Sequence, residues 1–287
     1  MHEFFEKIAK FNNIMFDEEW HSYTINGVKM VSVTKVTGAL QKPFDAVSIS
    51  IKCVAKMKRE AREKGLPEPT VTPEDLQLQW AKNNLLARAK GSAVHKYLEV
   101  TLMNKMQRYP SDIVQSEYAK DFKKNPALKF DDDPVKPMYD ACVAHVNRFI
   151  NDIRGKMFPV KSELVIGSEK YGVCGMIDQI FYNPKSGGFE IWDWKTNSEF
   201  DTTSKYHLEA PCAHLEKCKL TEYSLQLHCY KKIFEEETGI PIKNCYLCWF
   251  SEKQDNYKIM KCQDVANEAA ILLTTIPATL QKPTMLV

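Results

Sequence analysis

Long apolar runs and an excess of one charge are both missing from this 287-residue chain. Apolar runs such as 269–273 are far shorter than the ~20 residues that cross a bilayer, so we expect no membrane span. Basic and acidic residues number 39 and 37, which is too even a balance to indicate a nucleic-acid binder by bulk charge, and such binding would need a local patch. The first 20 residues lack the basic start and apolar core of a secretion signal and are too acidic for a transit peptide.

Regular cysteine spacing is also scarce. The nine cysteines are odd in number and irregularly spaced, which indicates reduced thiols and therefore an intracellular protein, cytoplasmic or wherever its substrate resides. Cys245 and Cys248 have the spacing of metal ligands, but a second such pair is missing. Either the two thiols bind a metal or, as we favour, they are buried strand residues.

The local patterns predict a helical first half and a strand-rich second half. We expect a hairpin over 20–37 with its turn at Asn26-Gly27, helices over 45–64 and from Thr72, a break near Gly91, helix again over 91–106, a polar loop over 108–134 and a helix over 135–153. After these come three strands, over 160–168, 173–182 and 189–196, and a polar connection over 197–220. The remaining elements are a helix over 221–238 ended by Gly239, strands over 243–251 and 256–262, and a helix from about 264. This order predicts one domain over 1–287, in which an N-terminal elaboration over 1–158 precedes an α/β core over 159–287 with a mixed central sheet flanked by helices.

Two aspartates lie symmetrically about the turn over 183–188. Asp178 precedes the turn centre by 7.5 positions and Asp193 follows it by 7.5. In a symmetric hairpin these side chains face each other, and like charges placed so are destabilising. A divalent cation such as Mg²⁺, which takes carboxylate ligands, would offset the repulsion.

Strand alternation adds a cation to this pair. Asp193 and Lys195 share one face of the strand, whereas Trp192 and Trp194 point to the other and can pack in the core. A solvated surface hairpin is the alternative for an isolated Asp-x-Lys. Because the expected hairpin register places Asp178 opposite Asp193, we favour a metal site.

Two helical pairs carry further polar side chains. Gly91 and His95 lie one turn apart, and the glycine would let another backbone approach a histidine able to bind a metal. Gln226 and Tyr230 are likewise one turn apart. Taken alone, each pair could be structural.

Together the four motifs resemble a known family. Gly-x-x-x-His, Gly-x-x-Asp, Asp-x-Lys and Gln-x-x-x-Tyr, ending at His95, Asp178, Lys195 and Tyr230 respectively, occur in the order seen in RecB-like nucleases of the PD-(D/E)XK superfamily. The stretch 31–35 and Trp80 are similar to the branch that contains the mitochondrial genome maintenance exonuclease and related phage and viral exonucleases. The likeness covers about 22–235 and implies a restriction-endonuclease-like core.

The resemblance also implies a role for each matching residue. One or two Mg²⁺ or Mn²⁺ ions would be held by His95, Asp178, Asp193, the Trp194 carbonyl and, as relatives often carry an acid there, Glu163. Lys195 would orient and help deprotonate the attacking water, while Gln226 and Tyr230 would support the lysine or the scissile phosphate. No iron–sulfur cluster is expected, because the late cysteines are too widely spaced.

The expected activity is metal-dependent hydrolysis of DNA phosphodiester bonds by an exonuclease that favours single strands or free ends, in replication, repair or recombination. A structure-specific endonuclease and a non-catalytic DNA-binding module remain alternatives. The sequence names no protein partner. Basic residues expected to contact phosphates, unless they form solvated helix faces, are Lys52, Lys56, Arg59, Arg88 and Lys90.

Overall fold

The computed structural model describes residues 1–17, 20, 22–103, 108–130 and 132–280. Its strands are β1 (Ile14–Asp17), β2 (Ser22–Ile25), β3 (Val28–Ser32), β4 (Phe158–Ser168), β5 (Val173–Asn183), β6 (Gly188–Lys195), β7 (Ile242–Trp249) and β8 (Lys258–Lys261). Its helices are α1 (His2–Ile8), α2 (Val33–Gly38), α3 (Ala46–Glu63), α4 (Pro73–Leu102), α5 (Ser111–Phe122), α6 (Val135–Ile153), α7 (Lys219–Thr238) and α8 (Ala266–Leu280), with short 3₁₀ helices η1 (Ala9–Asn13) and η2 (Pro126–Leu128).

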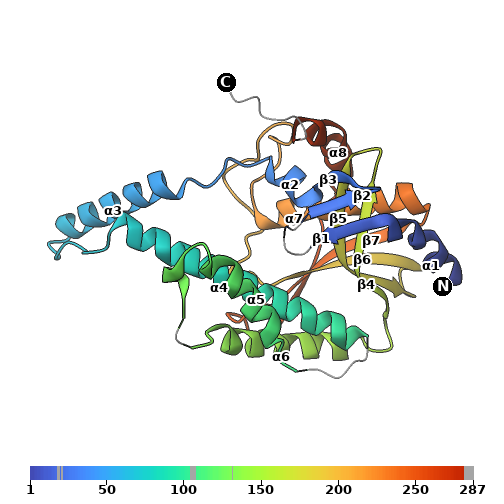
Figure 1. Cartoon of the computed structure of the whole chain (residues 1–287), viewed down its shortest axis with the longest axis horizontal. Helices are drawn as coiled ribbons and strands as arrows, with labels where there is room; N and C mark the ends of the chain where they lie inside the picture. Colours follow the sequence, from blue (N-terminus) through green and yellow to red (C-terminus); the bar gives the residue numbers. More distant parts are fainter. Residues whose placement is uncertain (18–19, 21, 104–107, 131, 281–287) are drawn as a thin grey trace.

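The strands form one mixed sheet with helices on both faces, which confirms the predicted fold class (Figure 1). The order is β1-β2-β3-β5-β6-β7-β8, and β4 pairs with β5 outside this path. The pairs β3–β5 and β6–β7 are parallel and the others antiparallel.

The sheet forks at β5. Strand β4 occupies one edge of β5 along nearly its whole length. The opposite edge pairs with β3 at Val173 and Cys174, and with β6 only from Gln179 onward. Among the described strands, neither β3 nor β6 pairs with 175–178 on this edge, so the sheet opens there.

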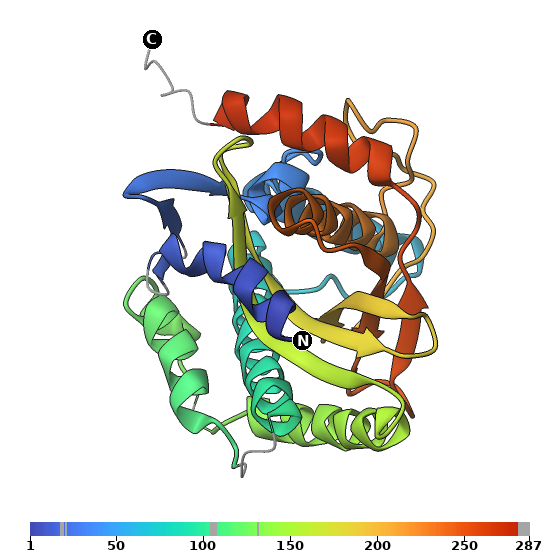
Figure 2. The same ribbon diagram turned by 90° about the vertical axis from the view of Figure 1, so that its right-hand side faces the viewer.

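Helices cover both faces of the sheet (Figure 2), and the two larger hydrophobic cores of the described residues lie on opposite faces of it. Ile191 packs in the core that includes α7 and α8, whereas Trp192 and Trp194 pack in the core that includes α4 and α6. The alternation predicted for β6 is therefore confirmed.

Several local predictions need correction. The hairpin turns at Asn26 and Gly27 as expected, with φ of 50° and 79°, but its second strand ends at Ser32, whose hydroxyl caps α2. The helix predicted to break near Gly91 runs unbroken as α4, and the predicted loop over 108–134 contains α5. Of the predicted helix over 91–106, residues 104–106 lie outside the described residues.

Helix α3 and the first turns of α4 project from the body of the molecule as a two-helix arm (Figure 1). The expected cap at Thr72 is present as a capping box with Asp75, so α4 begins where the sequence indicated. None of the helices in the described ranges combines the length and apolar character that a bilayer-spanning segment needs.

Candidate active site

Three carboxylates form a row across β4, β5 and β6. The pairing of β4 with β5 continues on both sides of the position where Glu163 meets Asp178. The register that pairs Gln179 with Trp192 places Asp193 one step further along, beside Asp178. The predicted turn centre of the second hairpin is thereby confirmed, and the three acids lie where the sheet opens.

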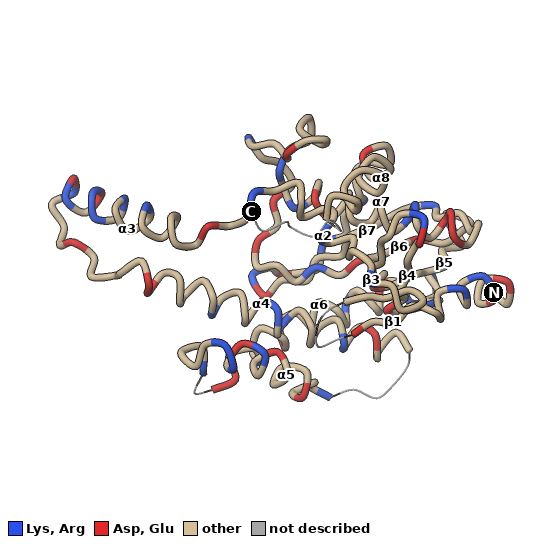
Figure 3. The backbone as a smooth tube through the Cα atoms, turned by 45° about the horizontal axis from the view of Figure 1, so that its top comes forward, with Lys and Arg blue, Asp and Glu red and all other residues tan. Residues whose placement is uncertain are grey.

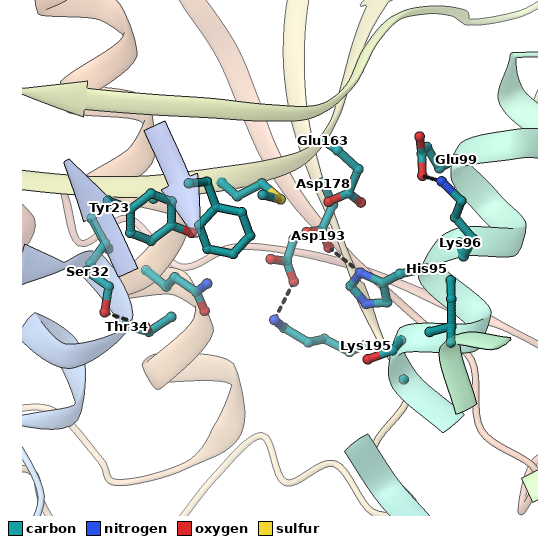
Figure 4. A pocket seen from close by; sticks show the side chains of 18 of the residues that line it. Tyr23, Ser32, Thr34, His95, Lys96, Glu99, Glu163, Asp178, Asp193 and Lys195 are labelled. Atoms are coloured by element: carbon teal, nitrogen blue, oxygen red, sulfur yellow. Dashed lines mark hydrogen bonds and ion pairs between the residues drawn. The ribbon is translucent and has the colours of Figure 1, made fainter. Parts of the chain in front are cut away.

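Helix α4 brings His95 to this row. The Nε2 of His95 lies 3.0 Å from the Trp194 carbonyl, and since a carbonyl only accepts, Nε2 carries the hydrogen. In a neutral ring Nδ1 then has a lone pair, and this atom lies 3.6 Å from Oδ2 of Asp178 (Figure 4). Two acceptors that face each other in this way require a proton or a metal ion between them.

A set of possible metal ligands converges at the same place. One ligand atom each from His95, Glu163 and Asp178 lies within 4.8 Å of the others. The Trp194 N–H donates to Oδ2 of Asp178 at 2.8 Å, which fixes that carboxylate. Asp193 does not belong to this compact set, because its Oδ2 is turned to Lys195 (Figure 4).

The carboxylates of the row lie close together, and the nearby positive charges do not fully offset their mutual repulsion. Burial, followed by the charges of Asp178, Glu99 and Asp193, raises the pKa of Glu163 to about 9. Burial also raises the pKa of Asp193 to about 6, against the lowering effect of Lys195. A bound cation would relieve both shifts.

The backbone at Glu163 is unusual. Its φ is 47°, in the left-handed region, which costs a non-glycine residue on the order of 1 kcal/mol or more. Such conformations cluster at functional sites, and here the residue directs its side chain into the row of acids (Figure 4).

Lys195 completes the charged centre. Its Nζ lies 2.5 Å from Oδ2 of Asp193, and the lysine side chain is 13% exposed. Burial lowers the pKa of Lys195, but the carboxylates of Asp193 and Asp178 outweigh this effect and raise it. The buried Oδ2 of Asp193 therefore has the Lys195 ammonium as its partner, and the atoms of the described residues that face one another without a cation are those of His95, Glu163 and Asp178. Imidazole nitrogen and carboxylate oxygens fit Mg²⁺ or Mn²⁺.

The Gly-x-x-Asp and Gln-x-x-x-Tyr motifs are in direct contact. A Cβ on Gly175 would lie 2.4 Å from Cε1 of Tyr230, so only glycine lets the tyrosine ring pack on β5 here. The Gln226 amide donates to the Tyr230 hydroxyl at 2.9 Å. Burial raises the pKa of Tyr230 well above its usual value, which keeps the hydroxyl neutral and able to donate.

Gly91 allows a close approach of a different kind from the one predicted. A Cβ there would lie 3.3 Å from Oγ1 of Thr196, so the neighbour is a side chain and not another backbone. Thr196 directly follows β6, and Gly91 thus helps α4 to cross the end of the strand that carries Lys195.

These residues line a cavity of about 700 Å³. Its wall also includes residues that no sequence motif identified as functional, namely Phe16, Tyr23, Thr34, Ser92, Glu99, Glu117 and Lys120. They come from β1, β2, α2, α4 and α5, and their approach depends on the tertiary fold, so the sequence carried little signal for them.

The basic residues predicted to hold substrate do not form one surface. Lys52, Lys56 and Arg59 are exposed on the α3 arm, where lysines and arginines dominate (Figure 3). Arg88 contacts the carboxylates of Glu117 and Asp121 on α5.

The prediction that Lys90 contacts substrate phosphates needs a correction. This lysine is 1% exposed, and its Nζ lies 2.7 Å from Oε2 of Glu252. A buried, paired ammonium cannot reach a phosphate at the surface, so we remove Lys90 from the expected substrate contacts.

The thiols of Cys245 and Cys248 belong to opposite faces of β7. Cys245 packs in the core that includes α7, and Cys248 in the core that includes α4 and α6. The two residues therefore do not form a common metal site, and the interpretation as buried strand thiols is confirmed.

Comparisons with known proteins leave the family open. No protein-family model and no curated protein matches the chain. Among solved structures, a crystal structure of a "Putative exonuclease" from Eubacterium rectale is 15% identical with a TM-score of 0.42, and the match covers 68% of this chain and 66% of that one. The crystal structure of SSO0001 is 14% identical with a TM-score of 0.31, over 66% of this chain and 85% of that one. At these values neither structure assigns the chain to a family.

Proposed function

We propose that this protein is a metal-dependent deoxyribonuclease, an exonuclease of the RecB-like branch of the PD-(D/E)XK superfamily that acts in DNA replication, repair or recombination. The observation that carries the proposal is the convergence of the three-strand carboxylate row, the imidazole of His95 and the ammonium of Lys195 on one cavity. His95, Asp178, Asp193 and Lys195 stand at motif positions, and Glu163 stands where relatives often carry an acid.

The metal would be held by His95, Glu163 and Asp178, with Asp193 and the Trp194 carbonyl alongside. A bound Mg²⁺ or Mn²⁺ acidifies water and neutralises charge on phosphate oxygens. The convergence of one ligand atom each from His95, Glu163 and Asp178 within 4.8 Å and the raised pKa of Glu163 both support a cation at this place.

The remaining residues orient the reactants. Lys195 holds a fixed positive charge in a largely buried position, where it can orient a water and stabilise charge that develops on the phosphate. Gln226 and Tyr230, hydrogen-bonded to each other, face the same cavity and can position the lysine or the scissile phosphate.

The basic residues on the α3 arm support a nucleic-acid substrate, and the choice of DNA rests on the resemblance. The α3 arm carries Lys52, Lys56 and Arg59 on exposed positions, and contacts of this kind would hold phosphates without reading sequence. Arg88 adds a partly exposed guanidinium beside α5.

A labelled linear single-stranded oligonucleotide tests the proposal. Wild type should shorten it with Mg²⁺ or Mn²⁺, and EDTA should stop cleavage. We expect Asp193→Asn and Lys195→Met to lower kcat at least about a hundredfold, because each removes charge that stabilises the transition state. The matched controls Asp140→Asn and Lys136→Met alter an exposed helical pair and should cleave normally. Normal cleavage by Asp193→Asn would refute the site.

The alternatives give different outcomes with other substrates. A circular single strand resists an exonuclease, so its cleavage would indicate an endonuclease. Tight DNA binding without turnover under any divalent metal would indicate a binding module.

A further inference from the structure

One face of α7 carries a residue that the motifs do not include. Tyr223 lies three positions before Gln226 and seven before Tyr230, so the three side chains share a helix face. Gln226 and Tyr230 line the cavity, whereas Tyr223 is not among the described residues that do. Tyr223 therefore lies beside the cavity and not in its wall.

The ring of Tyr223 packs directly on the catalytic ammonium. The Nζ of Lys195 lies 4.0 Å from the ring centroid, well within the range of a cation–π contact. The same Nζ lies 2.5 Å from Oδ2 of Asp193. The ammonium is thus held between a carboxylate and an aromatic face.

Tyr223 is itself anchored to the strand that carries the lysine. Its hydroxyl donates to Oδ1 of Asn197 at 3.0 Å, and the Asn197 carbonyl accepts from the Trp249 indole at 2.6 Å. Phe200 packs on the ring at 5.7 Å between centroids. The segment after β6 therefore fixes the ring that faces Lys195.

We propose that Tyr223 is a positioning residue that holds the Lys195 ammonium beside Asp193 and the row of acids. A lysine stem has many rotamers, and the ring removes those in which the ammonium leaves the cavity. The inference rests on the proposed function, because it gives Lys195 a role in hydrolysis. It assigns to Tyr223 no contact with substrate.

A purely structural role is the competing explanation. Lys219 also approaches the Tyr223 ring, at 5.9 Å, and is paired with Glu222. If the ring only stabilised the first turn of α7, its loss would change stability and leave the kinetics of the folded fraction intact.

The kinetic test compares Tyr223→Leu with Tyr223→Phe. Removing the ring should lower kcat about tenfold or more and leave KM for a labelled oligonucleotide nearly unchanged. Tyr223→Phe keeps the ring and should restore most of kcat. Tyr223→Met replaces Tyr223→Leu if that variant does not fold. Full kcat without the ring, or a Phe variant as impaired as the Leu variant, would overturn the proposal.

A second readout needs no activity. In EDTA, the Tm shifts of Tyr223→Leu and Lys195→Met should not add in the double variant, because each single change already removes the same contact. The matched control combines Tyr206→Leu with Lys205→Met. Lys205 also lies over a tyrosine ring, at 5.2 Å, but that ring belongs to the exposed Tyr206. The Tm shifts of these two variants should add in their double variant. Additive shifts at Tyr223 and Lys195 would overturn the proposal. Failure of wild type to cleave DNA would instead refute the proposed function, and the Tm cycle would still decide whether the contact exists.

Discussion

At Glu163, burial and neighbouring charge act in the same direction. Both raise its pKa, from an ordinary 4.5 to about 9. The metal-free protein therefore carries at neutral pH a proton that the unfolded chain has released. A cation that binds to the carboxylate must displace this proton, so metal affinity should increase with pH.

The same shift predicts how metal-free stability depends on pH. Between about pH 5 and 9 the folded state binds more protons at Glu163 than the unfolded state, so the free energy of unfolding falls as pH rises. Glu163→Gln should reduce this fall. The measurement is Tm in EDTA between pH 6 and 8.5. Glu199→Gln, at a side chain 90% exposed, should behave as wild type. An unchanged pH dependence in Glu163→Gln would contradict the account of this site.

Gly175 gives a steric prediction at the same scale. A methyl group there would meet the Tyr230 ring at 2.4 Å, and that tyrosine is 3% exposed and cannot move aside freely. Gly175→Ala should lower the free energy of unfolding by about 1–3 kcal/mol. Urea unfolding measures it.

The matched control is Gly38→Ala in α2, where nothing lies within 4 Å of the added Cβ. This variant should be as stable as wild type or up to about 1 kcal/mol more stable. Equal stabilities for the two alanine variants would show that the ring does not need the glycine.

At the scale of elements, α4 is fastened across the end of β6. His95 contacts the Trp194 carbonyl, Gly91 leaves room for the Thr196 side chain, and Lys90 reaches Glu252 just beyond β7. Ser198 donates to the other oxygen of Glu252 at 2.8 Å. This ladder of contacts sets the position of the histidine relative to the acids.

The buried pair predicts a large effect of a single change. Lys90→Met leaves the half-buried Glu252 carboxylate without its cation, which should cost about 1–3 kcal/mol of unfolding free energy. The double variant Lys90→Met with Glu252→Leu should recover much of the loss. Lys136→Met, at an exposed helical pair, should cost less than about 0.5 kcal/mol. A Lys90→Met variant as stable as wild type would show that the contact between Lys90 and Glu252 does not stabilise the packing of α4 across β6.

Element prediction succeeded where local chemistry decides and failed where packing does. The Asn26-Gly27 turn, the Thr72 cap and the Gly239 stop, whose φ is 68°, are set by neighbouring residues. Gly91 reads as a helix break in the sequence, yet contact with Thr196 makes glycine suitable inside α4. Similarly, the ammonium of Lys90 looks like a surface group until its partner Glu252, which lies just beyond β7 and far away in the sequence, is known.

At the scale of the whole molecule, the basic arm and the row of acids are separated. The basic α3 arm projects from the body (Figure 3), while Glu163, Asp178 and Asp193 lie where the sheet forks. If the arm holds DNA, it should affect binding and leave the chemical step unchanged.

Salt dependence tests this separation. Replacing Lys52, Lys56 and Arg59 by alanine should make the slope of log K against log salt less steep by about 0.7–0.9 for each lost phosphate contact, with kcat preserved. Fluorescence anisotropy with a labelled single strand and Ca²⁺ in place of Mg²⁺ measures the slope. Alanine at the exposed lysines Lys156, Lys185 and Lys205 is the control and should change it much less. Equal slopes in both triple variants would remove the arm from the substrate surface.

The part of the site that depends on the symmetry of the two hairpins could be predicted from the sequence. Asp178 and Asp193 lie equally far from one turn, and the structure keeps that register. The same arithmetic applied to the turn over 169–172, centred at 170.5, places Glu163 opposite Asp178. The sequence thus contains a geometric argument for Glu163 in addition to the resemblance. Tyr23 and Tyr223 could not be found this way, because their approach depends on how β2 and α7 pack.

The most direct test of the central claim is an anomalous difference map from a crystal soaked in Mn²⁺. We predict a strong peak among His95, Glu163 and Asp178, beside Asp193, that disappears in Asp178→Asn. A map with no peak in this row of acids, or a peak that persists in that variant, would contradict the proposal that the fork of the sheet is a metal-dependent active site.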